Sequence, residues 1–351
     1  MTMRRFAPLL LALAFFSLAA AQSLTGAGAT FPFPLYSKMF SVYGQQTGVK
    51  VNYQAIGSGG GQQQLLSRTV NFAASDAPLS DQQLADFQAK NGSPVLHLPM
   101  ALGAVVLTYN WAPVAKAPAQ PLKLDGQVVA DIFLGKITNW DDPALKALNP
   151  DVTFPNLPIS VAHRSDGSGT TYVFTDYLSK VSPEWKSKVG SSTSVSWPVG
   201  SGGKGNQGVA GLVKQIPGSF GYVELIYALQ NDMPYATLKN ASGNFIVPSL
   251  DSTSVGGDVP VPADGRFDIT NSPAAQGYPI ATYTYILLYQ DMSLTTDSVE
   301  QAKQVVALVK WMSTEGQQYS TALDYGPLPK RVQDFDAAQV AKLTFKGQPL
   351  N

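Results

Sequence analysis

Short apolar and β-branched runs alternate with amphipathic segments along most of this chain, and this alternation constrains the fold more than any other feature. It is typical of an α/β architecture, in which helices cover the faces of a sheet. The segment 248–277 lacks periodicity and is rich in Ser, Gly, Pro and Asp, so we predict a long surface excursion there, with room for short strands. Strands are expected at 49–53, 72–74, 95–99, 105–109, 159–162, 220–223 and 283–289, and helices at 32–46, 60–67, 81–90, 126–134, 170–180, 205–215 and 299–314.

The N-terminal segment 1–21 has the pattern of a secretory signal peptide. A start containing Arg4 and Arg5 is followed by an apolar run that ends in three alanines at Ala21. The run is too short to span a bilayer comfortably, although an anchored N-terminal helix is the alternative reading. No cysteine stands at the cleavage site to carry a lipid. We therefore expect cleavage near Ala21 and export to the periplasm.

Composition excludes several kinds of site and partner. The chain has no cysteine and only two histidines, which excludes disulfides and argues against a His/Cys metal site. Its 24 basic and 24 acidic residues provide no basic field that would attract nucleic acid or an anionic membrane. Ser168 lacks a nucleophile-elbow pattern, because Asp166 stands two residues before it where glycine is required. We expect no catalytic residue, metal or cofactor, and a protein that is not an enzyme.

The residues 163–170 read His-Arg-Ser-Asp-Gly-Ser-Gly-Thr and stand between a predicted strand and a predicted helix. A helix start has unpaired backbone N–H groups and a partial positive charge, and glycine lets a ligand approach them. Arg164 adds a planar fork of donors suited to an oxyanion. This segment therefore predicts a site for a small anion, whereas a surface pair of Arg164 with Asp166 is the plainer alternative.

Three more turns have the same strand-to-helix character. Thr30 and Phe31 follow a glycine-rich run, and Thr30 is expected to cap a helix beginning near Pro32. Ser58 lies in a run of glycines, and Asp76 follows a short strand. Taken singly, these turns could be a cap, a flexible loop and a turn residue. Because ligands of α/β folds bind at the carboxyl edge of the sheet, we expect all four turns to meet there.

Asp76 would make such a site selective. An ionised carboxylate only accepts hydrogen bonds, and phosphate keeps at least one proton near neutral pH, whereas sulfate keeps none. Asp76 would therefore pair with a phosphate O–H and repel a fully deprotonated sulfate.

Across the four turns described above and four further blocks of sequence, the chain resembles the periplasmic phosphate-binding proteins of the high-affinity ABC phosphate importer. The resemblance implies a two-lobed, class II periplasmic-binding-protein fold, each lobe a sheet flanked by helices, with phosphate between the lobes. It implies one lobe from 22–107 and 281–351 and another from 108–280, joined by two hinge crossings near 104–109 and 279–284. The matching blocks are 24–32, 51–58, 74–80, 134–142, 164–170, 202–205, 221–224 and 323–329.

The resemblance also assigns the site and the partners. Asp166 would pair with Arg164 and hold its guanidinium in place. The chain departs from the family at Gly59, where a second serine is common. The implied function is capture of inorganic phosphate and its delivery, by a monomer that binds no nucleic acid, to an ABC import permease in the membrane. The alternatives are a receptor for sulfate or arsenate and, more distantly, a secreted phosphatase-like protein. The implied phosphate contacts are Thr30, Phe31, Ser58, Asp76, Arg164, Ser168, Gly169 and Thr170.

Overall fold

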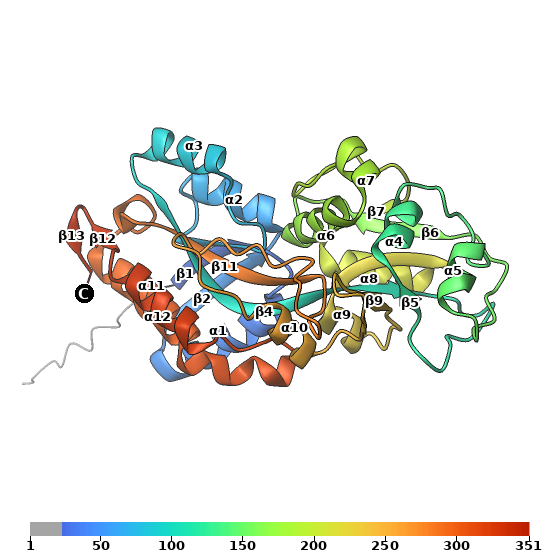
Figure 1. Ribbon diagram of the computed structural model, residues 1–351. Helices are drawn as coiled ribbons and strands as arrows, with labels where there is room; N and C mark the ends of the chain where they lie inside the picture. The colour runs from blue at the N-terminus through green and yellow to red at the C-terminus, as the bar shows by residue number, and fades with distance from the viewer. Residues whose placement is uncertain (1–22, 351) are drawn as a thin grey trace, which may run out of the picture.

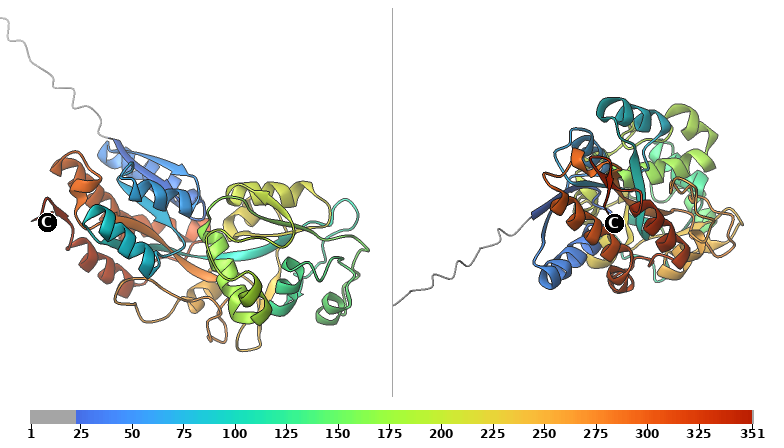
Figure 2. Two further views of the ribbon diagram at one scale, coloured as in Figure 1. Left: turned by 90° about the horizontal axis from the view of Figure 1, so that it is seen from above. Right: turned by 90° about the vertical axis from the view of Figure 1, so that its left-hand side faces the viewer.

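The structure, a computed structural model, describes residues 23–350, so the predicted signal peptide 1–21 lies outside the described residues. The molecule is elongated and consists of two halves that lie side by side (Figures 1 and 2). One mixed sheet runs through both halves, with the strand order β2-β1-β3-β11-β4-β8-β6-β7. Its strands are β1 (Ser23–Gly28), β2 (Lys50–Ala55), β3 (Phe72–Ser75), β4 (Val95–Tyr109), β6 (Ser160–Arg164), β7 (Ser201–Gly203), β8 (Ser219–Glu224) and β11 (Ala281–Tyr289).

Helices cover the sheet in both halves, as the alternation predicts. The helices are α1 (Phe33–Thr47), α2 (Ser58–Leu66), α3 (Asp81–Asn91), α4 (Gly126–Phe133), α5 (Pro143–Leu148), α6 (Gly169–Val181), α7 (Pro183–Lys188), α8 (Gly205–Gln215), α9 (Leu225–Gln230), α10 (Leu250–Gly256), α11 (Val299–Ser313) and α12 (Lys330–Val340). The first half contains α1–α3, α11 and α12, and the second half contains α4–α9 (Figure 1). In the first half, α2 and α3 lie on one side of the sheet and α1 and α11 on the other. In the second half, the ring of Phe174 packs between Phe133 and Tyr222, with centroid distances of 4.7 and 4.4 Å.

Shorter elements complete the chain. A three-stranded sheet contains β5 (Lys123–Leu124), β9 (Thr237–Lys239) and β10 (Phe245–Ile246), and a hairpin of β12 (Thr344–Phe345) and β13 (Gln348–Pro349) lies near the C-terminus. The short 3₁₀ helices are η1 (Met292–Leu294), η2 (Glu315–Tyr319) and η3 (Thr321–Leu323).

Strand β4 joins the two halves. The prediction of separate strands at 95–99 and 105–109 is wrong, because a single strand of 15 residues covers both. Its first part pairs antiparallel with β11 and its last part pairs antiparallel with β8. Pro99, which has no N–H to donate, is tolerated because the register with β11 shifts between Thr284 and Tyr285 at that point. One predicted crossing, near 104–109, therefore coincides with the last part of a continuous strand, where the pairing changes from β11 to β8.

Two further differences from the predictions have local causes. Strand β1 was not expected, because its run of small residues has low strand propensity. It forms because β2 and β3 pair with it on both sides, and Gly26 leaves room for the ring of Phe72, which a Cβ would approach to 2.2 Å. The excursion 248–277 contains no strand; it contains the helix α10, which Ser249 and Ser252 cap reciprocally.

One buried carboxyl has no evident partner. Asp336 on α12 is fully buried, and neither of its carboxyl oxygens has a hydrogen-bond partner among the described residues. Burial raises the pKa of Asp336 well above its ordinary value. The folded protein therefore holds a proton that the unfolded chain releases, so stability falls as the pH rises above the unfolded pKa of about 4.

We expect Asp336→Asn to raise the free energy of unfolding at pH 8 by at least about 1 kcal/mol, because asparagine keeps the shape without a charge. The decline in stability between pH 5 and pH 8 should shrink as well. Urea denaturation at both pH values measures these changes. Asp334→Asn, an exposed change on the same helix, is the matched control and should change little. A loss of stability at pH 8 in Asp336→Asn would contradict this account.

Candidate functional site

The four strand-to-helix turns meet where the two halves of the molecule touch. Backbone atoms of the halves are in direct contact, since Gly59 N–H donates to the carbonyl oxygen of Gly167 at 2.8 Å. A Cβ on Gly169 would lie 2.5 Å from Ser58 Oγ and 2.6 Å from Asp76 Oδ2, so this approach requires glycine. The structure therefore brings together all the predicted site residues, and all are buried: Thr30, Phe31, Ser58, Asp76, Arg164, Ser168, Gly169 and Thr170.

The segment after β1 is held by two tyrosines that lie far apart in the sequence. The Thr30 carbonyl oxygen accepts from Tyr227 Oη at 2.6 Å, and the Phe31 carbonyl oxygen accepts from Tyr325 Oη at 2.6 Å. The prediction that Thr30 caps the next helix is wrong, because α1 begins at Phe33 with Pro32 at the N-cap position and no side-chain cap. The Thr30 hydroxyl is thus free of a capping role and faces the second half.

Asp76 follows β3 and is 1 % exposed. Its Oδ1 accepts from Thr284 Oγ1 at 2.8 Å, and its N–H donates to Ser58 Oγ at 3.3 Å. Burial raises the pKa of Asp76 to about 7, although the Thr284 hydroxyl and the nearby Arg164 cation act in the opposite direction. Asp76 does not cap the next helix, because Ser80 does. Its Oδ2 is the oxygen that faces Gly169 and the second half.

Arg164, at the end of β6, is held by Asp166. The guanidinium donates from Nε to Oδ1 at 2.8 Å and from Nη2 to Oδ2 at 2.5 Å, which is a bidentate pair. Gly205 N–H also donates to Asp166 Oδ1, at 3.0 Å. Burial alone would raise the pKa of Asp166, but the hydrogen bonds and charge of Arg164 hold it below its ordinary value. Asp166 is thus the hydrogen-bond partner of Arg164; the arginine is buried and the aspartate is partly exposed.

The first turn of α6 supplies backbone donors. Ser168 is the N-cap of this 13-residue helix, and its Oγ accepts from Thr171 N–H at 3.0 Å. The N–H groups of Gly169 and Thr170 lie at the helix start, where no intrahelical acceptor exists and the helix dipole is positive. The site therefore offers hydroxyls, backbone N–H groups and one guanidinium, with Asp76 as a single acidic acceptor among them.

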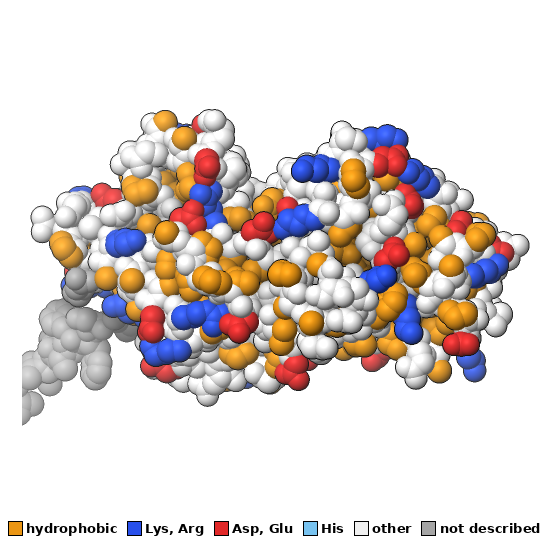
Figure 3. Space-filling model, viewed as in Figure 1, with side chains coloured by type: hydrophobic (Ala, Val, Ile, Leu, Met, Phe, Trp, Pro, Cys, Tyr) orange, Lys and Arg blue, Asp and Glu red, His pale blue; other side chains and the backbone are white. Residues whose placement is uncertain are grey.

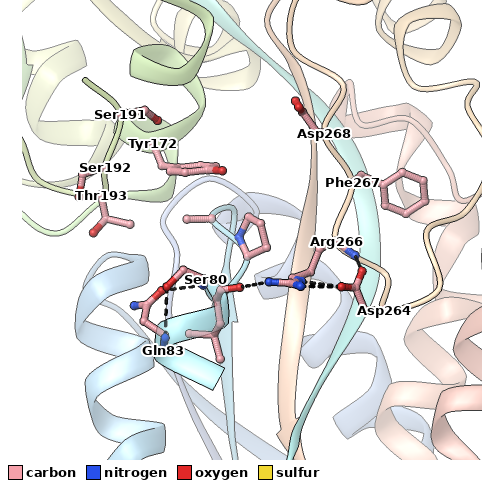
Figure 4. A pocket seen from close by; sticks show the side chains of 13 residues that line it. Ser80, Gln83, Tyr172, Ser191, Ser192, Thr193, Asp264, Arg266, Phe267 and Asp268 are labelled. Carbon is pink, nitrogen blue, oxygen red and sulfur yellow. Dashed lines mark hydrogen bonds and ion pairs between the residues drawn. The ribbon is translucent and has the colours of Figure 1, made fainter. Parts of the chain in front are cut away.

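A pocket of about 510 Å³ lies beside the site, and Ala77, which follows Asp76, is one of its lining residues. Figure 4 shows its three walls: Ser80 and Gln83 come from the first half, Tyr172 and Thr193 from the second, and the strand-free segment 264–268 from the excursion. In the space-filling view the surface is notched between the halves, between α3 and α7 (Figure 3).

The excursion is fastened to both halves at this pocket. Arg266 donates from Nη1 to the Leu79 carbonyl oxygen at 2.9 Å and forms an ion pair with Asp81 at 2.7 Å, both in the first half. On the other side, Lys180 of α6 forms an ion pair with Asp268. The segment predicted only as a surface excursion thus bridges the two halves at the pocket beside the site.

The two histidines have structural surroundings. His97 is buried, its Nε2 accepts from Leu79 N–H at 2.9 Å, and burial lowers its pKa to about 3. His163 stacks on Trp197 with ring centroids 4.8 Å apart. Over residues 23–350, no three His, Cys, Asp or Glu side chains are grouped so that they could hold a metal ion. Within the same range, no helix has the length and apolar character needed to cross a membrane.

Sequence reasoning missed several residues that hold the site together. Thr284 on β11 contacts Asp76, and Asn206 on α8 contacts both Thr30 and Thr170. Neither lies in one of the four turns, and each reaches the site through strand register or helix packing. The block at 202–205 ends one residue before Asn206 and was the nearest signal in the sequence.

Comparison with known proteins gives consistent matches over most of the chain. The model of a PBP superfamily domain matches residues 17–315. Phosphate-binding protein PstS of Pasteurella multocida is 44% identical over 320 residues, which cover 89% of this chain and 88% of that protein. Phosphate-binding protein PstS of Methanocaldococcus jannaschii is 37% identical over 308 residues, covering 83% of this chain and 78% of the relative.

Solved structures match the fold at lower identity. A high-affinity periplasmic phosphate-binding protein, PfluDING, solved with bound phosphate, superposes with a TM-score of 0.70 at 23% identity, covering 90% of this chain and 93% of that one. A phosphate-binding protein from Stenotrophomonas maltophilia gives a TM-score of 0.69 at 20% identity, covering 91% and 94%. These structural likenesses establish the α/β, two-lobed architecture.

Proposed function

This chain belongs to the phosphate-binding proteins of the PBP superfamily, and we propose that it captures inorganic phosphate between its two halves and delivers it to an ABC import permease in the membrane. We propose two lobes, 22–107 with 281–351 and 108–280, and a monomeric protein that binds no nucleic acid and catalyses no reaction. Export would follow cleavage of the segment 1–21, which places the receptor in the periplasm.

The observation that carries this proposal is a buried set of donors from both halves, aimed at one place, with one acidic acceptor among them. The Asp166 carboxylate compensates most of the Arg164 charge. A guanidinium has more N–H groups than the bonds to Asp166 and Thr170 use, so some remain for a ligand. An anion would therefore be held mainly by hydrogen bonds and helix N–H groups, without a large excess of positive charge.

Asp76 supports phosphate over sulfate. One of its oxygens already accepts from Thr284, and the other faces the meeting point of the halves. A phosphate that carries a proton can donate to this second oxygen, whereas sulfate has no proton to donate near neutral pH. An ionised Asp76 buried beside sulfate would leave two negative groups in contact, which is a strong penalty in a low-dielectric site.

Burial of every site residue implies that the anion enters while the halves are apart. We propose that rotation about β4 near Ala104 and about the chain near Pro279 closes the lobes over the anion. Closure excludes water and lowers the local dielectric, so the dipoles and the Arg164 charge act more strongly on the ligand.

We predict that Asp76→Asn relaxes the discrimination between phosphate and sulfate, because a neutral amide no longer repels a deprotonated anion. Phosphate should bind about tenfold more weakly, since its O–H loses a charged acceptor, whereas Arg164→Ala should weaken it at least about 100-fold. Isothermal titration calorimetry of the wild type and both variants with both anions measures this, at about pH 8.5, where Asp76, with a pKa of about 7, is ionised. Asp334→Asn, which changes the net charge equally but lies on α12 in an exposed pair with Lys330, is the control. An unchanged preference for phosphate in Asp76→Asn would refute the role of Asp76.

Small-angle scattering tests the closure. We expect the radius of gyration of the wild type to fall when phosphate is added. Gly169→Ala should abolish that change, because its Cβ would lie within 2.6 Å of both Ser58 Oγ and Asp76 Oδ2. Gly211→Ala on α8, where a Cβ meets nothing within 4 Å, is the matched control and should close normally. Closure of Gly169→Ala to the wild-type radius would contradict the proposed approach of the halves.

A further inference from the structure

Asn206 occupies a central position that none of the sequence motifs includes. It is the second residue of α8 and is fully buried. Its Nδ2 donates to Thr30 Oγ1 at 2.9 Å and to Thr170 Oγ1 at 3.2 Å, and its backbone N–H donates to Thr30 Oγ1 at 3.1 Å. Asn206 thus contacts one site hydroxyl from each half of the molecule.

The orientation of the Asn206 amide follows from a backbone contact. Its Oδ1 accepts from Glu224 N–H at 2.9 Å. A backbone N–H can only donate, so the oxygen end of the amide must face Glu224. The nitrogen end must then face the two threonine hydroxyls, and Asn206 is a donor to both of them.

Counting hydrogen bonds shows what each hydroxyl has left. A hydroxyl oxygen accepts through two lone pairs and donates one hydrogen. Thr30 Oγ1 accepts from the backbone and side-chain nitrogens of Asn206, and Thr170 Oγ1 accepts from Asn206 Nδ2 and Arg164 Nη1 at 3.2 Å. Both oxygens therefore have their acceptor capacity filled, and each has only its O–H hydrogen to offer.

We propose that Asn206 is a positioning residue that turns the hydroxyls of Thr30 and Thr170 into obligate donors toward the bound anion. This inference rests on the proposed phosphate-binding function. An unoriented hydroxyl could point a lone pair at a phosphate oxygen, which would be repulsive; here that arrangement is excluded. The Thr170 hydrogen has a second acceptor within reach, the Asp76 carboxylate, whose pKa it helps to lower. The Thr30 hydroxyl has no acceptor other than the anion among the described residues, so the test is made at Thr30.

The same contacts link the orientation of Thr30 to closure. Thr30 follows β1 in the first half, whereas Asn206 and Thr170 belong to helices of the second half (Figure 1). Both donors to Thr30 Oγ1 come from Asn206, so the Thr30 hydroxyl acquires its fixed direction only when the halves meet. Its contribution to binding is therefore made in the closed form.

A double-mutant cycle separates this role from simple packing. We would measure the Kd for inorganic phosphate by calorimetry in wild type, Thr30→Val, Asn206→Asp and the double variant. Asn206→Asp keeps the acceptor for Glu224 N–H but replaces the donor by a second acceptor, so the Thr30 hydroxyl turns away from the anion. We expect Thr30→Val to weaken binding about 10- to 100-fold in the wild type and less than about threefold in Asn206→Asp.

The cycle distinguishes the competing explanations. If Asn206→Asp acted only through its charge or by loosening the fold, the loss caused by Thr30→Val would persist in full, and the proposal would be overturned. Asn206→Ala, which adds no charge, should also reduce the effect of Thr30→Val and keeps the test valid if the aspartate variant is unstable. Gln207→Ala, an exposed amide on the same helical turn, is the control and should leave the Kd unchanged. Wild-type protein that binds no phosphate would instead refute the proposed function itself.

Discussion

The pairing of the buried Arg164 with the partly exposed Asp166 is the interaction on which the site depends. A guanidinium that is 3 % exposed is very unfavourable without a partner, and Asp166 meets it with two parallel hydrogen bonds while also accepting from Gly205 N–H. The pair anchors the start of α8 to the end of β6 and places Arg164 against Thr170. It also keeps the local charge near neutral, so under the proposed function the discrimination between anions would rest on hydrogen-bond polarity and, above all, on Asp76.

Glycines allow this network to span two halves of the molecule. Gly59 and Gly167 bring backbones into hydrogen-bond contact, and Gly57 has a positive φ of 92° at a point where a Cβ would lie 2.2 Å from Asp166 Oδ2. Larger residues at these positions would hold the halves apart. The glycine runs that look like flexible loops in the sequence are therefore the surfaces at which the halves meet, and the polar groups beside them are shared between the halves.

The sequence predicted the local parts of this arrangement and missed the parts that depend on tertiary packing. The turns with Ser58, Asp76 and Arg164 were located because each follows an apolar strand, and their convergence follows from the geometry of α/β sheets. Thr284 could not be found in this way, because it reaches Asp76 only through the pairing of β11 with β3. Thr30 was assigned a capping role from its position before Pro32, whereas Asn206, distant in sequence, binds its hydroxyl. Strand β1 escaped detection because its pairing partners, and not its own residues, make it a strand.

The most direct test of the central claim is a calorimetric titration of the wild-type mature protein with phosphate and, separately, with sulfate at about pH 8.5, where Asp76, with a pKa of about 7, is ionised and phosphate still keeps one proton. The site combines converging donors with one carboxylate that accepts a hydrogen bond from a protonated anion. We therefore predict a Kd for phosphate near micromolar or tighter, which corresponds to a binding free energy of about 8 kcal/mol, and sulfate binding at least about 100-fold weaker. Equal affinity for the two anions, or no saturable binding of phosphate, would contradict the account.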